Sequence, residues 1–248
     1  MTNYDRDPTE EQRSEWNKEQ ERIREQLLLH DMITFNADTL GNLKYVAGVD
    51  LSFPLDDFEN AIACLVVMEF PRFLPTKLHL PYISGYLAFR EVNPLLFLLN
   101  QLKKEEPHLY PQVILVDGNG LLHPRRFGIA CHLGVLSNTP TVGVAKNFLV
   151  IPSEFDDMHS IKSACKKVLL RRGDVYNLIG NTSQLCYGAA VKTSEAASNP
   201  VYISQGHRIS LQTAIKVVLA TSPKYRVPEP IRAADCLSRA YIRENSSV

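Results

Sequence analysis

The chain has 248 residues, of which 45% are hydrophobic, so it is long enough to bury a sizeable core. Its 27 basic and 27 acidic residues balance, which argues against a protein that coats nucleic acid through total charge alone but leaves room for a local basic groove. No secretory signal or membrane-spanning stretch is evident. The five cysteines form no Cys-x-x-Cys pair, so neither a disulfide framework nor a cysteine zinc site is expected, and the chain is predicted to be intracellular.

The first predicted elements are a polar helix and a group of strands. Residues 8–29 are rich in Glu, Arg and Gln, with Trp16, Ile23 and Leu27 near one helical face. This pattern predicts a surface helix within about the first 29 residues. Apolar runs typical of strands follow at 44–53 and 59–70, with a third candidate at 76–83.

The remaining elements alternate between strands and helices. Residues 85–106 are predicted to form a helix in two pieces, because Asn93 and Pro94 can cap and begin the second piece and leave Glu91 at the junction. Further strands are predicted at 113–116, 141–145, 185–191 and 201–208, and further helices at 126–136, 162–172, 210–221 and 230–245. The order predicts one α/β domain with a mixed central sheet flanked by helices.

Two acidic residues, Asp50 and Asp117, lie where buried strands are predicted to end. If these strands are parallel neighbours, the two acids lie about 5 Å apart. Carboxylates that close repel, so one takes up a proton or a cation binds between them. Oxygen ligands without nearby Cys or His favour Mg²⁺ or Mn²⁺ over zinc. The alternative is that each Asp only begins a turn; for two of them, followed by Ser52 and by the segment 118–120, the metal site is the favoured interpretation.

Two further acids are less decisive. Asp235 falls within the inward stripe of the last predicted helix, where a buried charge needs a partner or a metal. An ion pair with Arg232 or Arg239 explains Asp235 equally well. Glu91 is adjacent to Arg90 on a predicted helix, so on this reasoning it is a surface ion pair.

Basic residues follow the predicted strand ends. His123, Arg125 and Arg126 come shortly after Asp117, and guanidinium groups suit phosphate oxygens. Combined with a metal they suit phosphoryl transfer; the alternative is a solvated helix terminus. Lys146 either neutralises a phosphate or is an ordinary strand-end lysine. The sequence has no P-loop or dinucleotide fingerprint, which gives poor support to a nucleotide cofactor.

Four segments in this order resemble the endonuclease V family, whose members act on inosine or deoxyinosine. They are GVDLSF from Gly48, PYISGYLAFRE from Pro81, VDGNGLLHPRRFGIACHLGV from Val116 and TVGVAKN from Thr141. The resemblance implies a ribonuclease-H-like fold over a single catalytic domain, residues 1–248. It also implies Mg²⁺-dependent hydrolysis, with Mn²⁺ as a substitute, of the second phosphodiester bond 3′ to inosine. The products would carry 3′-hydroxyl and 5′-phosphate ends.

The resemblance also assigns roles to residues. Asp50, Glu91 and Asp117 match the family's catalytic carboxylates and metal ligands, and Lys146 matches a lysine near the scissile phosphate. The wedge that enters the gap left by the displaced base matches Pro81, Tyr82, Ile83 and Ser84, with Ser84 where the family usually has proline. The pocket for the base matches Leu87, Gly118, Gly128, Ile129 and Gly143, where glycines let backbone approach a flat base.

The last helix links the chain to one branch of that family. Bacterial members have histidine at the position of Asp235, whereas animal members have an acid. This resemblance implies a catalytic role for Asp235 and a preference for inosine in single-stranded RNA. It further implies a monomer without membrane association, acting in the cytoplasm and the nucleus or nucleolus. The rival hypotheses are a repair enzyme for deoxyinosine in DNA and a module that binds inosine without cutting.

Overall fold

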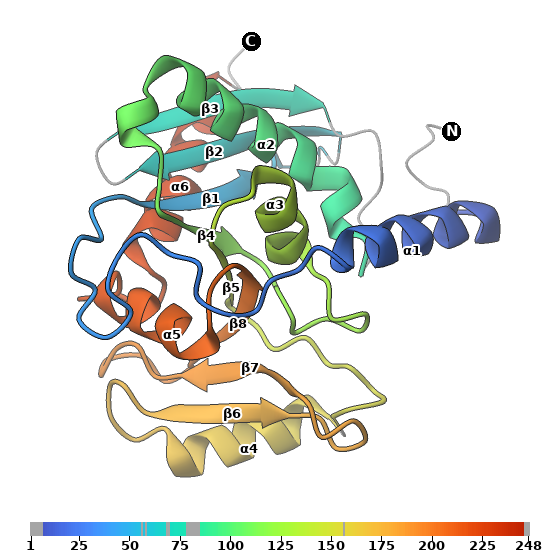
Figure 1. Ribbon diagram of the computed structural model, residues 1–248, viewed down its shortest axis with the longest axis vertical. Helices are drawn as coiled ribbons and strands as arrows, with labels where there is room; N and C mark the ends of the chain where they lie inside the picture. Colours follow the sequence, from blue (N-terminus) through green and yellow to red (C-terminus); the bar gives the residue numbers. More distant parts are fainter. Residues whose placement is uncertain are drawn as a thin grey trace.

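The computed structural model of the chain describes residues 7–55, 57, 59–67, 70–77, 85–155 and 157–245 (Figure 1). Its strands are β1 (Val46–Ser52), β2 (Asn60–Val67), β3 (Phe70–Lys77), β4 (Val113–Asp117), β5 (Thr141–Ala145), β6 (Val175–Ile179), β7 (Cys186–Val191) and β8 (Val201–His207). Its helices are α1 (Glu10–Arg24), α2 (Leu87–Glu105), the short 3-10 helix η2 (Pro107–Leu109), α3 (Ile129–Ser137), α4 (Met158–Val168), α5 (Leu211–Ala220) and α6 (Glu229–Asn245). None of the described helices is long and apolar enough to cross a bilayer.

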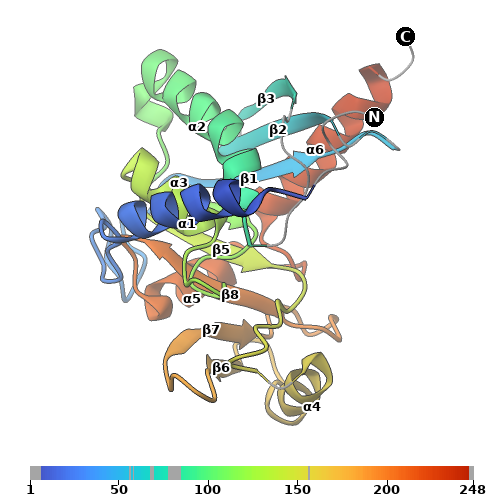
Figure 2. The same ribbon diagram turned by 90° about the vertical axis from the view of Figure 1, so that its right-hand side faces the viewer.

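The described strands form one eight-stranded sheet in the order β3-β2-β1-β4-β5-β8-β7-β6. β1, β4 and β5 run parallel to one another, whereas β2 and β3 on one side and β8, β7 and β6 on the other pair antiparallel. Helix α2 covers one face of the β1–β2–β3 half, and α6 covers the opposite face (Figure 2). The predicted mixed sheet flanked by helices is confirmed, and its fold is ribonuclease-H-like.

Most predicted elements are present, with three corrections. The third strand begins at Phe70, earlier than predicted, and the rest of the predicted span, 78–83, lies outside the described residues. Helix α2 is continuous and contains Pro94, because the buried leucines that follow this residue anchor both halves on the sheet. Helix α3 begins only at Ile129, since Arg126 adopts a left-handed conformation with a φ of 52°.

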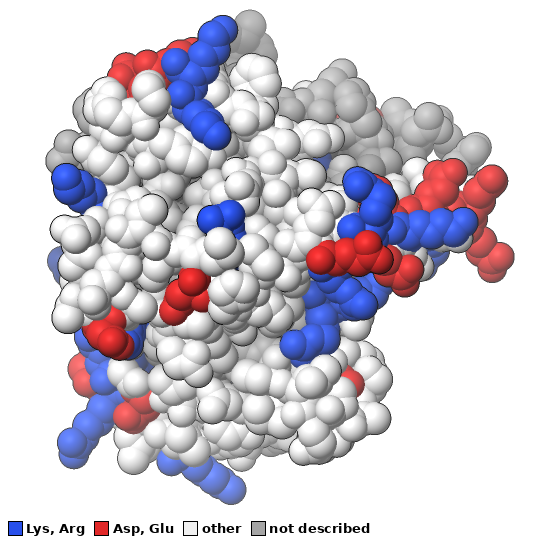
Figure 3. All heavy atoms as spheres, in the orientation of Figure 1, with Lys and Arg blue, Asp and Glu red and all other residues white. Residues whose placement is uncertain are grey.

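Helix α1 is capped at its N-terminus by Thr9, whose side chain accepts a hydrogen bond from the Gln12 amide. Acidic and basic side chains crowd its outer surface, as predicted for a solvated helix (Figure 3). Its inner face packs against the domain, because Gln20 and Ile23 are buried. Trp16 stacks on Phe89 and lies at a tilt against Tyr86. The helix is therefore tied to the body of the domain.

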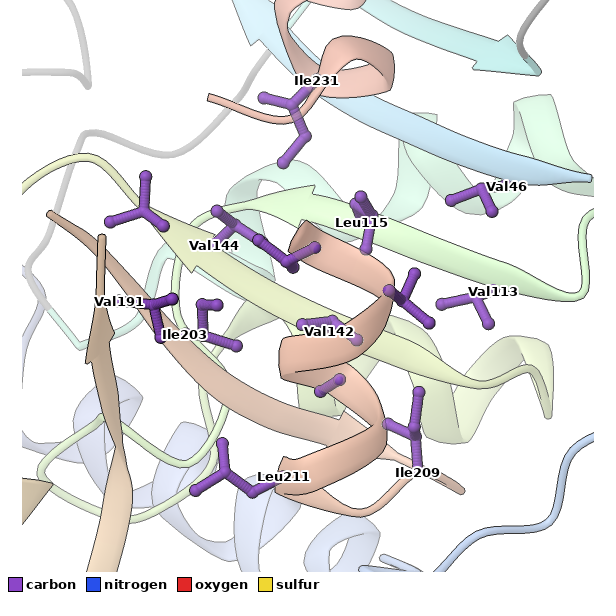
Figure 4. Close-up of a cluster of buried hydrophobic side chains, with 14 of the residues drawn as sticks. Val46, Val113, Leu115, Val142, Val144, Val191, Ile203, Ile209, Leu211 and Ile231 are labelled. Carbon is purple, nitrogen blue, oxygen red and sulfur yellow. The ribbon is translucent and has the colours of Figure 1, made fainter. Parts of the chain in front are cut away.

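The core lies in two layers because alternate side chains of a strand point to opposite faces of a sheet. On the face covered by α5 and α6, buried side chains come from β1, β4, β5, β7 and β8 (Figure 4). On the face covered by α2 and α3, they come from β1, β2 and β4. In β4, for example, Val113 and Leu115 pack on the first face, whereas Ile114 and Val116 pack on the second.

Candidate active site

Two acidic side chains lie on the same face of the sheet at its carboxyl edge. In β4, Asp117 continues the alternation of Val113 and Leu115 on the α5–α6 face. In β1, Asp50 has the same parity as Val46 on that face. Because Val49 pairs with Val116 across the parallel β1–β4 ladder, the two acids come next to each other where the strands end.

Helix α6 approaches this face very closely. A Cβ atom at Gly48 would collide with the backbone of Pro230, so glycine is required for the first turn of α6 to lie on β1. This docking brings Asp235 over the strand ends. The resulting open pocket has a volume of about 340 Å³ and is lined by Asp50, Leu51, Ser52, Phe53, Asp117, Lys146, Asp235 and Arg239.

The charges in this pocket form a chain of ion pairs. Lys146 Nζ lies 2.7 Å from Asp117 Oδ2 and 4.0 Å from Asp235 Oδ2. Asp235 Oδ1 in turn accepts a hydrogen bond of 2.7 Å from Arg239 Nε. Burial would lower the pKa of Lys146, but Asp117 and then Asp235 outweigh it and raise the pKa above its usual value. The predicted ion pair with Arg239 is present, and Asp235 also lines the pocket that holds Asp50 and Asp117.

Asp50 is the most buried acid of the pocket. Its burial, then the nearby Asp117 and Asp235 carboxylates, raise its pKa well above the usual range, while Lys146 acts in the opposite direction. Ser52 Oγ lies 3.4 Å from Asp50 Oδ2 and 2.6 Å from Ser238 Oγ, which links β1 to α6. Without a bound cation, the closeness of the Asp50 and Asp117 carboxylates is therefore electrostatically unfavourable.

Glu91 reaches the carboxyl edge from the other face of the sheet, near the start of α2. It is 7% exposed, so it is not the surface ion pair that the sequence favoured on its own. Burial raises the pKa of Glu91 to about 7, with Arg90 lowering it and Asp117 raising it further. Glu91 does not line the large pocket, but it lies close enough for Asp117 to act on it.

The donor set fits a hard divalent cation better than any other metal. Among the described residues, no three His, Cys, Asp or Glu side chains converge closely enough to hold a metal ion alone. The pocket instead offers the Asp50–Asp117 pair, and a cation there would relieve the repulsion that raises the pKa of Asp50. Mg²⁺ keeps several waters and is commonly bound by one or two carboxylates, so a pair of acids suits it.

A smaller, mainly apolar pocket of about 70 Å³ lies beside the acid cluster. It is lined by Gln20, Gly85, Leu87, Ala88, Gly118, Asn119, His123, Phe127, Gly128, Ile129 and Leu149. Four of the five residues predicted to surround a base are therefore brought together. The fifth, Gly143, lies behind the wall: a Cβ atom there would collide with the backbone of Gly120 and lie 2.7 Å from the carbonyl carbon of Asn119. Because Gly143 of β5 has no side chain, the segment from Gly118 to Gly120 that forms the pocket wall can pack directly against this strand.

Gln20 is the member of this pocket that the sequence interpretation missed. Its side-chain nitrogen lies 3.4 Å from the Gly85 carbonyl oxygen and 3.5 Å from that of Phe127. Its side-chain oxygen accepts a hydrogen bond from Arg125 Nε. Gln20 follows Trp16 by four residues and precedes Ile23 by three, so its place in the buried stripe of α1 was a usable signal.

The predicted phosphate ligands make contacts within the protein. His123 Nε2 lies 2.9 Å from the Gly85 carbonyl oxygen, and burial together with Arg125 lowers the pKa of His123 to about 4, so its ring is neutral near pH 7. Arg125 also donates to the Gly85 carbonyl and stacks on Tyr86. Arg126 donates to the Cys186 carbonyl at 3.1 Å. Their role as phosphate ligands stays a prediction. The predicted wedge, Pro81 to Ser84, lies outside the described residues, directly before Gly85.

A ribonuclease-H-like sheet with acids at the ends of adjacent parallel strands and a lysine beside them defines the class of phosphodiester-cleaving nucleases. The family model of endonuclease V matches residues 24–236. The chain belongs to the endonuclease V family.

Relatives and solved structures agree with this assignment. Human endonuclease V is 42% identical over 96% of this chain and 86% of the human protein, and the mouse protein is 42% identical over 95% and 71%. The crystal structure of the catalytic domain of human endonuclease V matches with a TM-score of 0.89 and 39% identity, covering 96% of this chain and 99% of that chain. Endonuclease V of Ciona intestinalis, in complex with DNA containing an inosine followed by a ribo-adenosine, matches with a TM-score of 0.89, 37% identity and the same coverage.

Proposed function

We propose that the protein is an inosine-directed endonuclease that cuts single-stranded RNA at the second phosphodiester bond 3′ to inosine. The products carry 3′-hydroxyl and 5′-phosphate ends. The observation that carries the proposal is the Asp50–Asp117 pair on adjacent parallel strands, with Lys146 2.7 Å from Asp117 and a small, mainly apolar pocket alongside. The nucleic acid bound to the Ciona protein supports inosine as the recognised base.

Asp50 and Asp117 would hold Mg²⁺ or, in its place, Mn²⁺, with Glu91 acting on the same site from the opposite face of the sheet. A bound divalent ion supplies Lewis acidity toward a phosphate oxygen and lowers the pKa of bound water. The protein's own contribution is the placement of charge. Lys146 brings its ammonium group to the phosphate, and Asp235, which is itself bound by Arg239, holds that ammonium group in position. Pro81 to Ser84 would serve as the wedge.

The small pocket would take the displaced base. Its apolar wall residues, Leu87 and Ile129, offer flat contact, and the backbone at Gly118 and Gly128 can approach the base edge without side chains in the way. A single catalytic domain over residues 1–248 is supported by the one sheet that runs through the described residues. A monomer in the cytoplasm and nucleus rests on the family resemblance.

The proposal includes a preference for RNA over DNA as the substrate. It is supported by the acid at Asp235, which matches the animal branch, and by the ribose that follows inosine in the Ciona complex. A nuclease distinguishes RNA from DNA through contact with the 2′-hydroxyl. The alternatives are the same chemistry on deoxyinosine DNA and inosine binding without cleavage; the assembled acid cluster argues against the second.

The test uses matched single strands that differ only in a ribose or deoxyribose on the 3′ side of inosine, in Mg²⁺, Mn²⁺ or EDTA. We expect cutting in both metals, none in EDTA, faster cutting of the ribose strand, and no cutting when adenosine replaces inosine. Equal rates on the two sugars would remove the RNA preference. Tight, metal-dependent binding without any product would favour the binding module.

A further inference from the structure

A third pocket, of about 220 Å³, opens beside α4, and the charged residues that line it are all lysines. It is lined by Lys162, Cys165, Lys166, Leu169, Lys192, Ala197, Ser198, Asn199 and Pro200. Lys162 and Lys166 are one turn apart on α4, both exposed, so their ammonium groups share one side of the helix. Within the described part of the chain, no acid forms an ion pair with any of the three lysines.

Lys192 comes from the other wall of the pocket, directly after β7. Its Nζ atom donates a hydrogen bond of 3.0 Å to the carbonyl oxygen of Ala197, which holds the ammonium group over the loop between β7 and β8. A backbone carbonyl does not neutralise the charge. The three lysines therefore surround a space that suits an anion.

This pocket lies on the same edge of the sheet as the acid cluster. Ala145 at the end of β5 pairs with Tyr202 of β8, and Val191 at the end of β7 pairs with Val201. Lys192 therefore lies at the same edge of the sheet as Lys146 and Asp117, directly after β7, which is three strands away from β4. At about 4.8 Å per strand, the separation is roughly 14 Å.

A direct connection holds the two regions together. Arg226 Nη1 donates to the carbonyl oxygen of Lys146 at 3.2 Å and to that of Pro200, in the lysine pocket, at 3.3 Å. Helix α4 itself lies against β6, at the end of the sheet opposite β3 (Figures 1 and 2). The lysine pocket is therefore fixed relative to the acids rather than carried on an independent segment.

We propose that the pocket formed by Lys162, Lys166 and Lys192 binds a backbone phosphate of the substrate strand, away from the bond that is cut. The proposal rests on the nucleic-acid substrate proposed above. A stacked strand rises about 3.4 Å per nucleotide along its axis, so the roughly 14 Å between the sites corresponds to about four nucleotides of a stacked strand. The pocket extends the binding track along the sheet edge and gives a neutral protein the local basic groove that its composition allowed.

The test compares the wild type with the double variant Lys162→Gln/Lys166→Gln, which removes two charges and keeps good helix formers on α4. The matched control is Lys44→Gln/Lys104→Gln, two exposed lysines near the opposite edge of the sheet. Binding of a fluorescent single strand containing inosine is measured in Ca²⁺, across a range of salt concentrations. Because each phosphate contact adds about 0.7 to the salt slope for a single strand, the double variant should lose about 0.7 and bind roughly fourfold more weakly near 0.15 M salt.

Two further measurements sharpen the result. Lys162→Arg/Lys166→Arg should restore the slope, since it keeps both charges. Extending the strand stepwise on its 5′ or 3′ side should raise wild-type affinity at the length that reaches the pocket, and the Gln variant should lack that rise. A Gln variant with the slope and affinity of the control would overturn the phosphate site while leaving the proposed function intact. A wild type that neither binds nor cuts strands with inosine would overturn both.

Discussion

The ammonium group of Lys146 lies 2.7 Å from the carboxylate of Asp117, at the ends of two adjacent parallel strands. This ion pair places a cation inside the acid cluster before any metal or substrate arrives. It partly offsets the repulsion among the acids, because Lys146 lowers the pKa of Asp50 while Asp117 and Asp235 raise it. Beside its proposed action on the substrate phosphate, the lysine therefore makes it easier for Asp50 to lose its proton.

Replacement of Lys146 by Met should slow cleavage by about 10²- to 10³-fold, the size typical of one lost electrostatic contact to a developing charge. It should also move the acidic limb of the pH–rate profile to higher pH, since the pKa of Asp50 rises without its cationic neighbour. Single-turnover rates between pH 5 and 9 measure both effects. Lys146→Arg should keep most of the profile, and an unshifted limb in the Met variant would contradict this role for the lysine.

Replacement of Asp50 by Ala should abolish cleavage and leave binding of inosine-containing RNA largely intact. The carboxylate is buried beside Asp117, where its absence removes half of the proposed metal pair. Asp7→Ala is the matched control, because that carboxylate is 94% exposed. Cleavage and binding are measured on the same labelled strand. Wild-type cutting by Asp50→Ala would show that the reaction uses another site.

Replacement of Glu91 by Gln should have opposite effects on stability and activity. The pKa of Glu91 is raised to about 7 from 4.5, so the folded protein holds a proton that the unfolded chain releases. Stability from this group is fully present below pH 4.5 and is lost as the pH rises through 7. The loss is on the order of 3 kcal/mol at pH 8.

Glu91→Gln should therefore unfold at higher denaturant concentration than the wild type at pH 8 in EDTA, with little difference at pH 4.5, while cutting more slowly in Mg²⁺. Urea titrations at the two pH values and cleavage assays measure these effects. A variant that is less stable than the wild type at pH 8 would show that Glu91 has favourable partners that outweigh its burial.

Replacement of Gln20 by Ala should destabilise the protein by about 1–3 kcal/mol, because it leaves the buried Phe127 carbonyl and the Arg125 Nε donor without their partner. It should also raise KM for inosine strands more than it lowers kcat, since Gln20 lines the small pocket and not the acid cluster. Glu15→Ala, on the exposed side of α1, is the control and should change neither quantity. Equal KM values for the wild type and Gln20→Ala would show that Gln20 of α1 takes no part in recognition of the base.

The central strands could be predicted from the sequence because their signal is local. An unbroken apolar run ending in an acid identified β4 within one residue, and β5 was predicted at its observed bounds. Edge elements gave weaker signals. β6 was missed because only Leu178 of its five residues is buried, so its hydrophobic pattern is faint. Pro94 suggested a break in α2, but burial of Leu95, Leu98 and Leu99 outweighs the lost hydrogen bond.

The site was predictable to the extent that its members sit at strand ends. Asp50 and Asp117 follow from that pattern, whereas Glu91 was found only through the family resemblance, since nothing local shows that α2 turns this residue inward. Gln20 was missed as a member of the small pocket because its partners lie far away in the sequence. Long-range contacts of this kind need the folded chain. Arg239 was predicted only as an ion-pair partner of Asp235, and this local pair is present in the structure.

The prolines of β3 have a consequence for how the molecule meets its neighbours. β3 is the last of the described strands at its end of the sheet, and Pro71 and Pro75 have no amide hydrogen to donate to a further strand. Another copy of the chain therefore finds an incomplete ladder of donors at this edge. The interruption that made the strand hard to recognise also guards the sheet against growth by strand addition, the first step toward aggregation.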